Sequence, residues 1–187
     1  MDKDTRNRIQ RATQAARRLL ELEYCEQLEG SFDILLNGSM GAQPGAHLTA
    51  AERVQREKLV ATVAHKRAAG LSAPDAVAAY LREASFTTLN RFVALKMLEA
   101  RGLVQQCVSK GDESGGFKEF TALAPALASL PDRGYRLYVE TIFDEIGQEV
   151  RVLFDRRDVA SLVWPRRQAL HDLLAILNDP ELASIWG

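Results

Sequence analysis

The sequence has little cysteine and no long apolar run. Cys25 and Cys107 are the only cysteines in 187 residues, and they do not form a CxxC pair. Two cysteines are too few for a disulfide framework, so we expect both thiols to be packing residues in a reducing, cytoplasmic setting. No run of about 18 apolar residues occurs, and no apolar signal region follows the polar N-terminus. We therefore expect neither a membrane span nor ordinary export.

An excess of charge of one sign is lacking as well. Lys and Arg together number 24 against 25 Asp and Glu, which gives a formal net charge of -1. Such a balance excludes a strongly basic protein that binds nucleic acid over its whole surface, so any basic surface must be local. The hydrophobic fraction of 47% is enough for a proper core, and we expect a single domain.

Patterns that carry catalysis are also missing. The three histidines, His47, His65 and His171, lie far apart and none falls in HExxH, and the sequence has no GxSxG elbow. The glycine-rich stretch 37–46 lacks the order of a nucleotide-binding P-loop. Carboxylates in the stretch 140–145 are expected to pair with neighbouring arginines in solvent. We therefore predict no catalytic, cofactor-binding or metal-ligating residue in this chain.

Apolar residues at helical spacing recur along most of the chain and predict an all-α fold, an irregular multi-helix bundle. Thr49–Glu52 has the spacing of a capping box that starts a helix, and Ser72–Asp75 repeats it. We expect one helical domain over 1–187, with a long helical arm over 1–36 and a core over 47–187, while residues 103–120 leave room for one short hairpin. A further helix is expected over about 117–130, and Pro125 would bend or split it. Another helix should begin at Pro131–Asp132 and continue along an apolar stripe that reaches Phe154. One more is expected after Pro165.

The end of the chain is unusual in composition. Trp186, a large apolar residue, stands next to the last residue with no polar tail after it. This composition is typical of a cut inside a longer protein, so we expect the chain to be a fragment of a larger one.

The stretch 85–102 predicts the central helix of the fold. Its apolar residues recur at steps of three and four and should share one broad face, namely Phe86, Leu89, Phe92, Val93, Met97 and Leu98. The opposite side would carry Thr87, Thr88, Asn90, Arg91 and Lys96. Gly102 can take the left-handed conformation that ends a helix. The polar pair Asn90–Arg91 interrupts a segment in which simple packing would favour aliphatic residues.

Basic residues gather in two places and give the candidate DNA contacts. The first helix begins with six Lys and Arg residues against two Asp over positions 2–18 and becomes acidic afterwards. Such a face could contact phosphates, although most charge runs are simply solvated helix faces. On the central helix, Asn90 could bond an adenine edge or a buried backbone group, and Arg91 could instead be held by Glu140 or Asp144 inside the fold. The candidate DNA-binding residues are Arg8, Arg11, Arg17, Arg18, Asn90, Arg91 and Lys96.

Three further features of the sequence are distinctive. They are an aromatic residue followed by Asn-Arg and an apolar run within Ser85–Leu103, Tyr135-Arg-Leu-Tyr138 with Phe143-Asp-Glu-Ile146, and Leu153-Phe-Asp-Arg156 leading to Trp164-Pro165. With these features the chain resembles the N-terminal regions of PglX-like adenine-specific DNA methyltransferases of bacterial phage-defence systems and of the related type IIG restriction-modification proteins. The resemblance covers about residues 84–186, whereas the first eighty residues match only in being helical.

The resemblance implies a helical domain that precedes a Rossmann-like methyltransferase domain acting on adenine N6. In such enzymes the N-terminal domain braces the catalytic domain and closes over DNA, and S-adenosylmethionine is the cofactor. This chain lacks the glycine-rich cofactor motif, and Asn178-Asp-Pro-Glu181 lacks the second proline and the aromatic residue of the catalytic motif. By this resemblance the chain itself is non-catalytic and holds no cofactor, and its partners are DNA, through the parent enzyme, and the downstream methyltransferase domain.

A scaffold or protein-interaction domain that never touches nucleic acid is the main alternative. The two hypotheses differ in what they require of the basic faces at Lys3–Arg18 and Arg91–Arg101. Exposed and contiguous basic faces favour DNA binding, whereas cations that are paired within the fold favour a scaffold.

Overall fold

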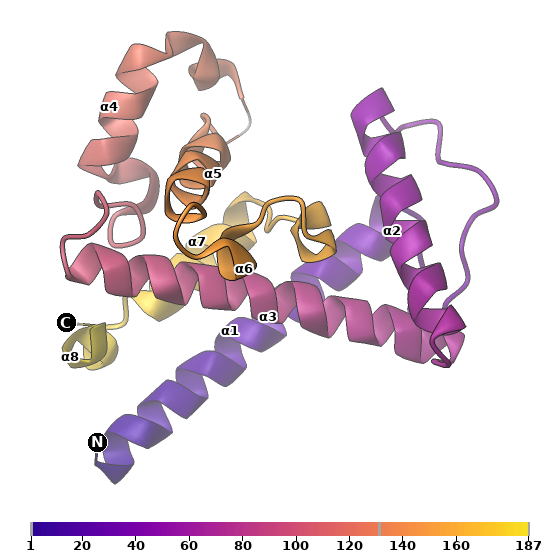
Figure 1. Cartoon of the computed structure of the whole chain (residues 1–187), viewed down its shortest axis with the longest axis horizontal. Coiled ribbons are helices and arrows are strands. Elements are labelled where there is room, and N and C mark those ends of the chain that lie inside the picture. The colour runs from indigo at the N-terminus through magenta and orange to yellow at the C-terminus, as the bar shows by residue number, and fades with distance from the viewer. Residues whose placement is uncertain (1, 131, 187) are drawn as a thin grey trace. The chain divides into compact units, whose positions relative to one another are not determined.

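The computed structural model describes residues 2–130 and 132–186, and over these ranges the chain forms α- and 3-10 helices and no strand. The predicted all-α fold is therefore confirmed (Figure 1). The α-helices are α1 Lys3–Gly30, α2 Ala50–Ala68, α3 Ala73–Ala100, α4 Gly115–Leu123, α5 Tyr135–Ile146, α6 Arg151–Phe154, α7 Arg167–Leu177 and α8 Ala183–Trp186. Within the described ranges, no helix combines the length and the apolar character that crossing a bilayer requires.

The chain divides into two compact units, and both α1 and α3 contribute to each of them. Unit 1 comprises Met1–Ala16, Leu89–Arg156 and Arg167–Gly187, and unit 2 comprises Arg17–Thr88 and Arg157–Arg166. Each unit therefore has its own set of core contacts, described separately below.

The core of unit 2 lies between the second half of α1, α2 and the first half of α3. Tyr24 and Tyr80 are fully buried, and their hydroxyl groups are satisfied: Tyr24 shares a hydrogen bond of 2.8 Å with Thr88, and Tyr80 donates to the carbonyl oxygen of Val159 at 3.1 Å. The 3-10 helix Val159–Leu162 packs against α2. The aliphatic part of this core consists of Leu20, Leu28, Leu59, Val63, Val77 and Leu81.

Helix α1 ends at Gly30, earlier than the predicted boundary near residue 36. Asp33 has a φ of 54°, in the left-handed region, so the chain turns there instead of continuing the helix. The loop that follows is held by Arg56 of α2, which is 5% exposed. Its guanidinium donates to the carbonyl oxygens of Phe32 at 2.7 Å and Gly41 at 2.6 Å. A buried cation thus satisfies the backbone of an irregular loop.

The predicted helix starts are confirmed. The Thr49 hydroxyl accepts a hydrogen bond from the amide of Glu52, and the Glu52 carboxylate accepts one from the amide of Thr49, which completes the capping box of α2. The Ser72 hydroxyl accepts from the amide of Asp75 at 3.2 Å at the start of α3. From there α3 runs without a break through Ser85 to Ala100, and Gly102 ends it with a φ of 68°.

The predicted division of the central helix into one apolar and one polar face is wrong. Phe86 is 55% exposed, whereas Arg91 and Lys96 from the expected polar side are 5% and 9% exposed. In unit 1, Leu95 is fully buried although it lies outside the expected stripe. Neighbouring segments cover this half of α3 on more than one side, so no broad solvent-facing stripe remains.

The rest of unit 1 departs from the predicted elements in three places. Residues 103–120 form turns, the 3-10 helix Gly111–Glu113 and the start of α4, so the hairpin is absent from this described stretch. Pro125 splits the expected helix 117–130 into α4 and the 3-10 helix Pro125–Ser129, as the sequence indicated. The expected start at Pro131 lies outside the described residues, and α5 begins at Tyr135.

The apolar stripe that was expected to continue to Phe154 is divided between α5 and α6. Helix α5 ends at Ile146, and α6 begins at Arg151. Phe143 and Phe154 still meet, with ring centroids 5.3 Å apart. Elsewhere in unit 1, α4 lies against α5. The Phe117 ring packs edge-on against the Tyr135 ring, with ring centroids 5.6 Å apart. Aromatic contacts therefore hold the short helices of unit 1 together.

The Arg56 arrangement makes a testable prediction for stability. Arg56→Lys keeps the charge but cannot bond both carbonyl oxygens with a planar fork, so we expect the free energy of unfolding to fall by about 1–3 kcal/mol. Urea denaturation followed by circular dichroism measures this change. Lys58→Arg, an exchange at an exposed position of the same helix, is the control and should leave stability unchanged. Equal stability of the Arg56→Lys and wild-type proteins would contradict the role given to the guanidinium.

Candidate functional site

The first half of α1 presents an exposed surface rich in arginine and side-chain amides. Asp2 starts the helix by accepting a hydrogen bond of 2.6 Å from the amide of Thr5, which holds the pKa of Asp2 below its usual value. The apolar positions Ile9 and Ala12 are half-buried, and Ala16 is fully buried. The remaining positions face solvent and include Lys3, Arg6, Asn7, Arg8, Gln10, Arg11 and Gln14.

A shallow polar hollow of about 580 Å³ lies on this surface. Besides Glu181, its lining consists of six residues of α1, namely Asp4, Asn7, Arg8, Gln10, Arg11 and Gln14. Arg8 and Arg11 approach the Glu181 carboxylate at 3.8 and 4.0 Å, and the three side chains are 43%, 73% and 61% exposed. Ion pairs this long and this exposed are weak, so the two guanidinium groups remain available for another anion.

Arg17 and Arg18 follow on the same helix and are also exposed. Arg17 approaches Glu21 at 3.6 Å, one helical turn later. This surface pair contributes little to stability, because solvent screens it. The four arginines predicted on the first helix are therefore all accessible.

Arg91, in contrast, is buried inside unit 1. Its guanidinium donates to the backbone carbonyl oxygens of Leu153 at 2.7 Å and Asp155 at 2.8 Å, and it stacks over the Phe143 ring at 5.6 Å. The partners predicted for it, Glu140 and Asp144, instead bind Arg156. Arg91 thus fixes the end of α6.

Lys96 is likewise used within unit 1. Its ammonium group donates to the Ser109 hydroxyl and to the side-chain oxygen of Asn178, both at 2.6 Å. Asn178 in turn donates to the carbonyl oxygen of Val108 at 2.9 Å. Asn90 lies half-buried on the same half of α3. The side chains of Arg91 and Lys96 therefore point into unit 1 and do not add to the exposed basic surface that α1 forms.

The carboxylate of Glu99 completes this internal network. It accepts hydrogen bonds from the amides of Cys107 at 2.9 Å, Val108 at 2.6 Å and Ser109 at 3.2 Å. Burial alone would raise the pKa of Glu99, but the hydrogen bonds from Ser109 and the other two amides outweigh it and lower the pKa. Three converging amides make the ionised carboxylate the stable form, which suits an anchor for the loop and not a general base.

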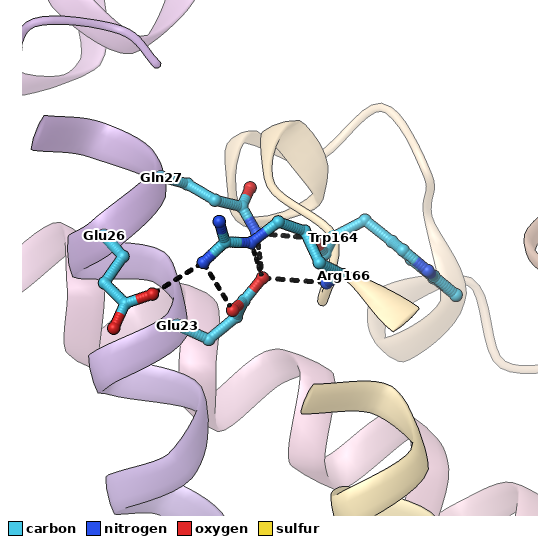
Figure 2. A network of polar contacts seen from close by, with 5 residues as sticks. All are labelled: Glu23, Glu26, Gln27, Trp164 and Arg166. Carbon is cyan, nitrogen blue, oxygen red and sulfur yellow. Dashed lines mark hydrogen bonds and ion pairs between the residues drawn. The ribbon is translucent and has the colours of Figure 1, made fainter. Parts of the chain in front are cut away.

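A largely buried carboxylate, Glu23 of α1, forms an ion pair with Arg166 in unit 2 (Figure 2). Glu23 is 7% exposed and accepts from the Nε and one Nη atom of the Arg166 guanidinium at 2.8 and 2.9 Å and from the amide of Arg166 at 2.8 Å. Gln27 donates to Glu23 at 2.7 Å and to the Trp164 carbonyl oxygen at 2.8 Å, and Glu26 accepts from Arg166 at 2.7 Å. The network fastens the segment 157–166 to α1.

Because both oxygens of the Glu23 carboxylate accept hydrogen bonds within unit 2, this group serves structure and not proton transfer. Burial would raise the pKa of Glu23, but the hydrogen bonds from Arg166 and Gln27 outweigh burial and lower it. The spacing of Glu23, Glu26 and Gln27 on one helix was visible in the sequence, whereas their common partner lies 143 positions after Glu23. Sequence reasoning consequently missed this network.

The described residues hold no group of three or more His, Cys, Asp or Glu side chains that could bind a metal ion. Of the two thiols, Cys107 is fully buried, and burial raises its pKa to about 12. Comparison with protein-family models, with curated proteins and with solved structures found no match in any of the three. The accessible arginine and amide surface of α1 is therefore the candidate functional site.

The pKa of Glu23 makes a prediction for the pH dependence of stability. A lowered pKa means that the ionised form stabilises the fold above about pH 4.5 and that this contribution is lost as the pH falls through the lower, folded-state pKa. We expect Glu23→Gln to lower the free energy of unfolding by about 1–3 kcal/mol at pH 7. The difference from wild type should shrink in urea denaturation at pH 3.

Glu26→Gln is the matched control, because the Glu26 side chain contacts the same arginine but is 56% exposed. Its effect at pH 7 should be clearly smaller than that of Glu23→Gln, since solvent screens the lost charge. A constant difference between wild type and Glu23→Gln from pH 7 to pH 3 would show that the Glu23 charge does not stabilise the fold.

Proposed function

We propose that this chain engages duplex DNA through exposed arginines of α1, as a non-catalytic helical domain of a bacterial adenine-specific DNA methyltransferase of the restriction-modification or phage-defence type. The observation that carries the proposal is the exposed polar surface that includes Arg8 and Arg11, whose only ion-pair partner among the described residues is the exposed Glu181.

The side chains on this surface suit a nucleic-acid backbone. Arginine binds phosphate oxygens with a planar fork of donors, and such contacts give affinity that does not depend on sequence. Asn7, Arg11 and Gln14 recur at steps of four and three, so they line one side of the helix. Asparagine and glutamine amides can bond adenine edges when a helix lies in the major groove. Phosphate contacts by arginine next to amide contacts with bases would orient the helix on DNA.

The resemblance of residues 84–186 to the N-terminal regions of adenine-specific methyltransferases supports the proposed parent enzyme. In this proposal S-adenosylmethionine binds to the downstream methyltransferase domain, and the present chain contributes DNA contacts and domain assembly. Arg91 and Lys96 are not included among the proposed DNA contacts, because their charged groups are bonded within unit 1.

The internal bonding of Arg91 and Lys96 is the observation that favours the second candidate function, a scaffold domain without DNA binding. A scaffold needs rigid helices more than accessible cations, and both residues serve rigidity. The two candidate functions differ in what the four arginines of α1 do, so those residues provide the test.

Replacing Arg8, Arg11, Arg17 and Arg18 by alanine removes the proposed phosphate contacts. We expect the affinity for a fluorescent duplex to fall at least about tenfold in low salt, and the dependence of log affinity on log salt to become shallower by up to about 0.9 for each lost contact. Fluorescence anisotropy over a series of salt concentrations measures both quantities.

The control is a variant with the same loss of charge at exposed positions elsewhere, Lys58, Arg67, Arg82 and Arg151 to alanine. It should bind like wild type apart from a small general effect of net charge. No binding by the wild-type chain in low salt would exclude DNA engagement by the isolated domain and favour the scaffold function. Equal losses in both variants would mean that net charge, not the α1 surface, attracts DNA.

The domain assignment also predicts how the chain behaves toward the cofactor. Isothermal titration of the isolated chain with S-adenosylmethionine should give no binding heat, because the cofactor-binding motif is expected downstream. Saturable binding of S-adenosylmethionine would contradict the non-catalytic assignment even if DNA binding were found.

A further inference from the structure

Unit 1 carries a second hollow, separate from the α1 surface, of about 520 Å³. Three segments line it: the loop after α3, helix α4 and helix α5. Its apolar lining includes Leu103, Phe120, Leu123 and Ile142, and its polar lining includes Glu119 and Glu145. The hollow therefore combines an apolar floor with carboxylates.

Aromatic contacts between α4 and α5 lie at this hollow. The Tyr138 ring lies 5.7 Å from the Phe117 ring and 5.5 Å from the Phe120 ring. A side chain on Gly116 would clash with the Tyr138 hydroxyl and the Gln105 side chain, so a larger residue there would displace these two groups. A preformed floor lowers the entropy lost when a partner binds.

Two leucines at this hollow are exposed to an unusual degree. Leu103 is 68% exposed and Leu123 is 88% exposed, although neighbouring core positions of unit 1 are nearly fully buried. Single exposed leucines need no explanation, but two that line the same hollow are typical of a surface that a partner covers. A small molecule inside the hollow would leave much of both side chains in water, so a larger partner fits better.

The charge at the hollow defines the chemistry of that partner. Glu119 and Glu145 are exposed, and neither forms an ion pair with any described part of the chain. The residues that line the hollow include no lysine, arginine or histidine. The surface is thus apolar at its base and negative beside it, which complements a partner with apolar side chains flanked by cations.

We propose that this hollow is a docking site for an amphipathic helix of another protein or domain, with leucine-like side chains on one face and lysine or arginine beside them. A strand partner is less suitable, because the described part of the chain has no strand whose edge it could extend. The apolar face of the helix covers Leu103 and Leu123, and its cations pair with Glu119 and Glu145. This surface serves assembly and does not depend on DNA binding by α1.

A peptide of defined composition tests the proposal. The probe is a fluorescein-labelled helical peptide of about 18 residues, with leucines on one face and lysines on the other, compared with a peptide in which glutamate replaces every lysine. We expect the lysine peptide to bind the wild-type chain saturably and the glutamate peptide to bind much more weakly, as measured by fluorescence anisotropy.

Charge reversal at the hollow should exchange this preference. We expect the double variant Glu119→Lys with Glu145→Lys to bind the lysine peptide about tenfold more weakly than the wild-type chain does. The same variant should bind the glutamate peptide more tightly than the wild-type chain does. The control Glu57→Lys with Glu149→Lys changes net charge equally at exposed positions outside the hollow and should leave the preference unchanged. Leu123→Ser should weaken binding of the lysine peptide without unfolding the chain, since this side chain is already exposed, and circular dichroism checks its fold.

Three results would overturn the proposal. These are no saturable binding of the lysine peptide, equal binding of the two peptides by the wild-type chain, and a preference that both charge-reversal variants change equally. The DNA test on the α1 arginines is independent, so failure of one proposal is distinguishable from failure of the other.

Discussion

Within each unit, hydrogen bonds between ionised side chains on helices and the backbone of irregular segments stabilise the packing. In unit 2, Arg56 binds two carbonyl oxygens of the loop after α1, and Glu23 binds the amide as well as the guanidinium of Arg166. In unit 1, Arg91 binds two carbonyl oxygens at the end of α6, and Glu99 accepts from three successive amides. Backbone groups outside regular helices need partners once they are buried, and these four side chains supply them.

This use of charge separates two groups of basic residues that look alike in composition. The charged groups of Arg91 and Lys96 donate hydrogen bonds within unit 1, so their charge stabilises the fold. The arginines of α1 have only long or exposed carboxylate contacts, so their charge remains at the surface. A cation held by strong internal hydrogen bonds loses them if it turns toward a ligand, whereas a weakly paired one loses little. The proposed DNA contacts therefore belong to a single helix.

Local signals made much of the fold predictable. The capping box at Thr49–Glu52, the stop at Gly102 and the split at Pro125 each depend on residues within one or two turns of each other, and each is found in the structure. The faces of α3 were not predictable, because burial there is decided by segments distant in sequence. Arg91 bonds Leu153, and Glu23 bonds Arg166. In both pairs the partners lie far apart in the sequence, so helical spacing cannot predict the contact. For the candidate site, the basic run on the first helix could be seen in the sequence, but its accessibility and its distinction from Arg91 and Lys96 required the fold.

Glu181 gives the α1 surface an anion of its own. When an arginine surface binds DNA, mobile anions that had gathered around it normally diffuse away, and the resulting gain in entropy adds to the release of cations from the DNA. Arg8 and Arg11 already have the Glu181 carboxylate nearby. That carboxylate is tethered to the chain, so it can swing aside but cannot be diluted into the solvent. In the proposed complex, Arg8 and Arg11 therefore release fewer mobile anions when they bind DNA. Replacing chloride by a bulkier anion in the buffer should change the contribution of these two arginines to DNA affinity less than it changes the contribution of Arg18.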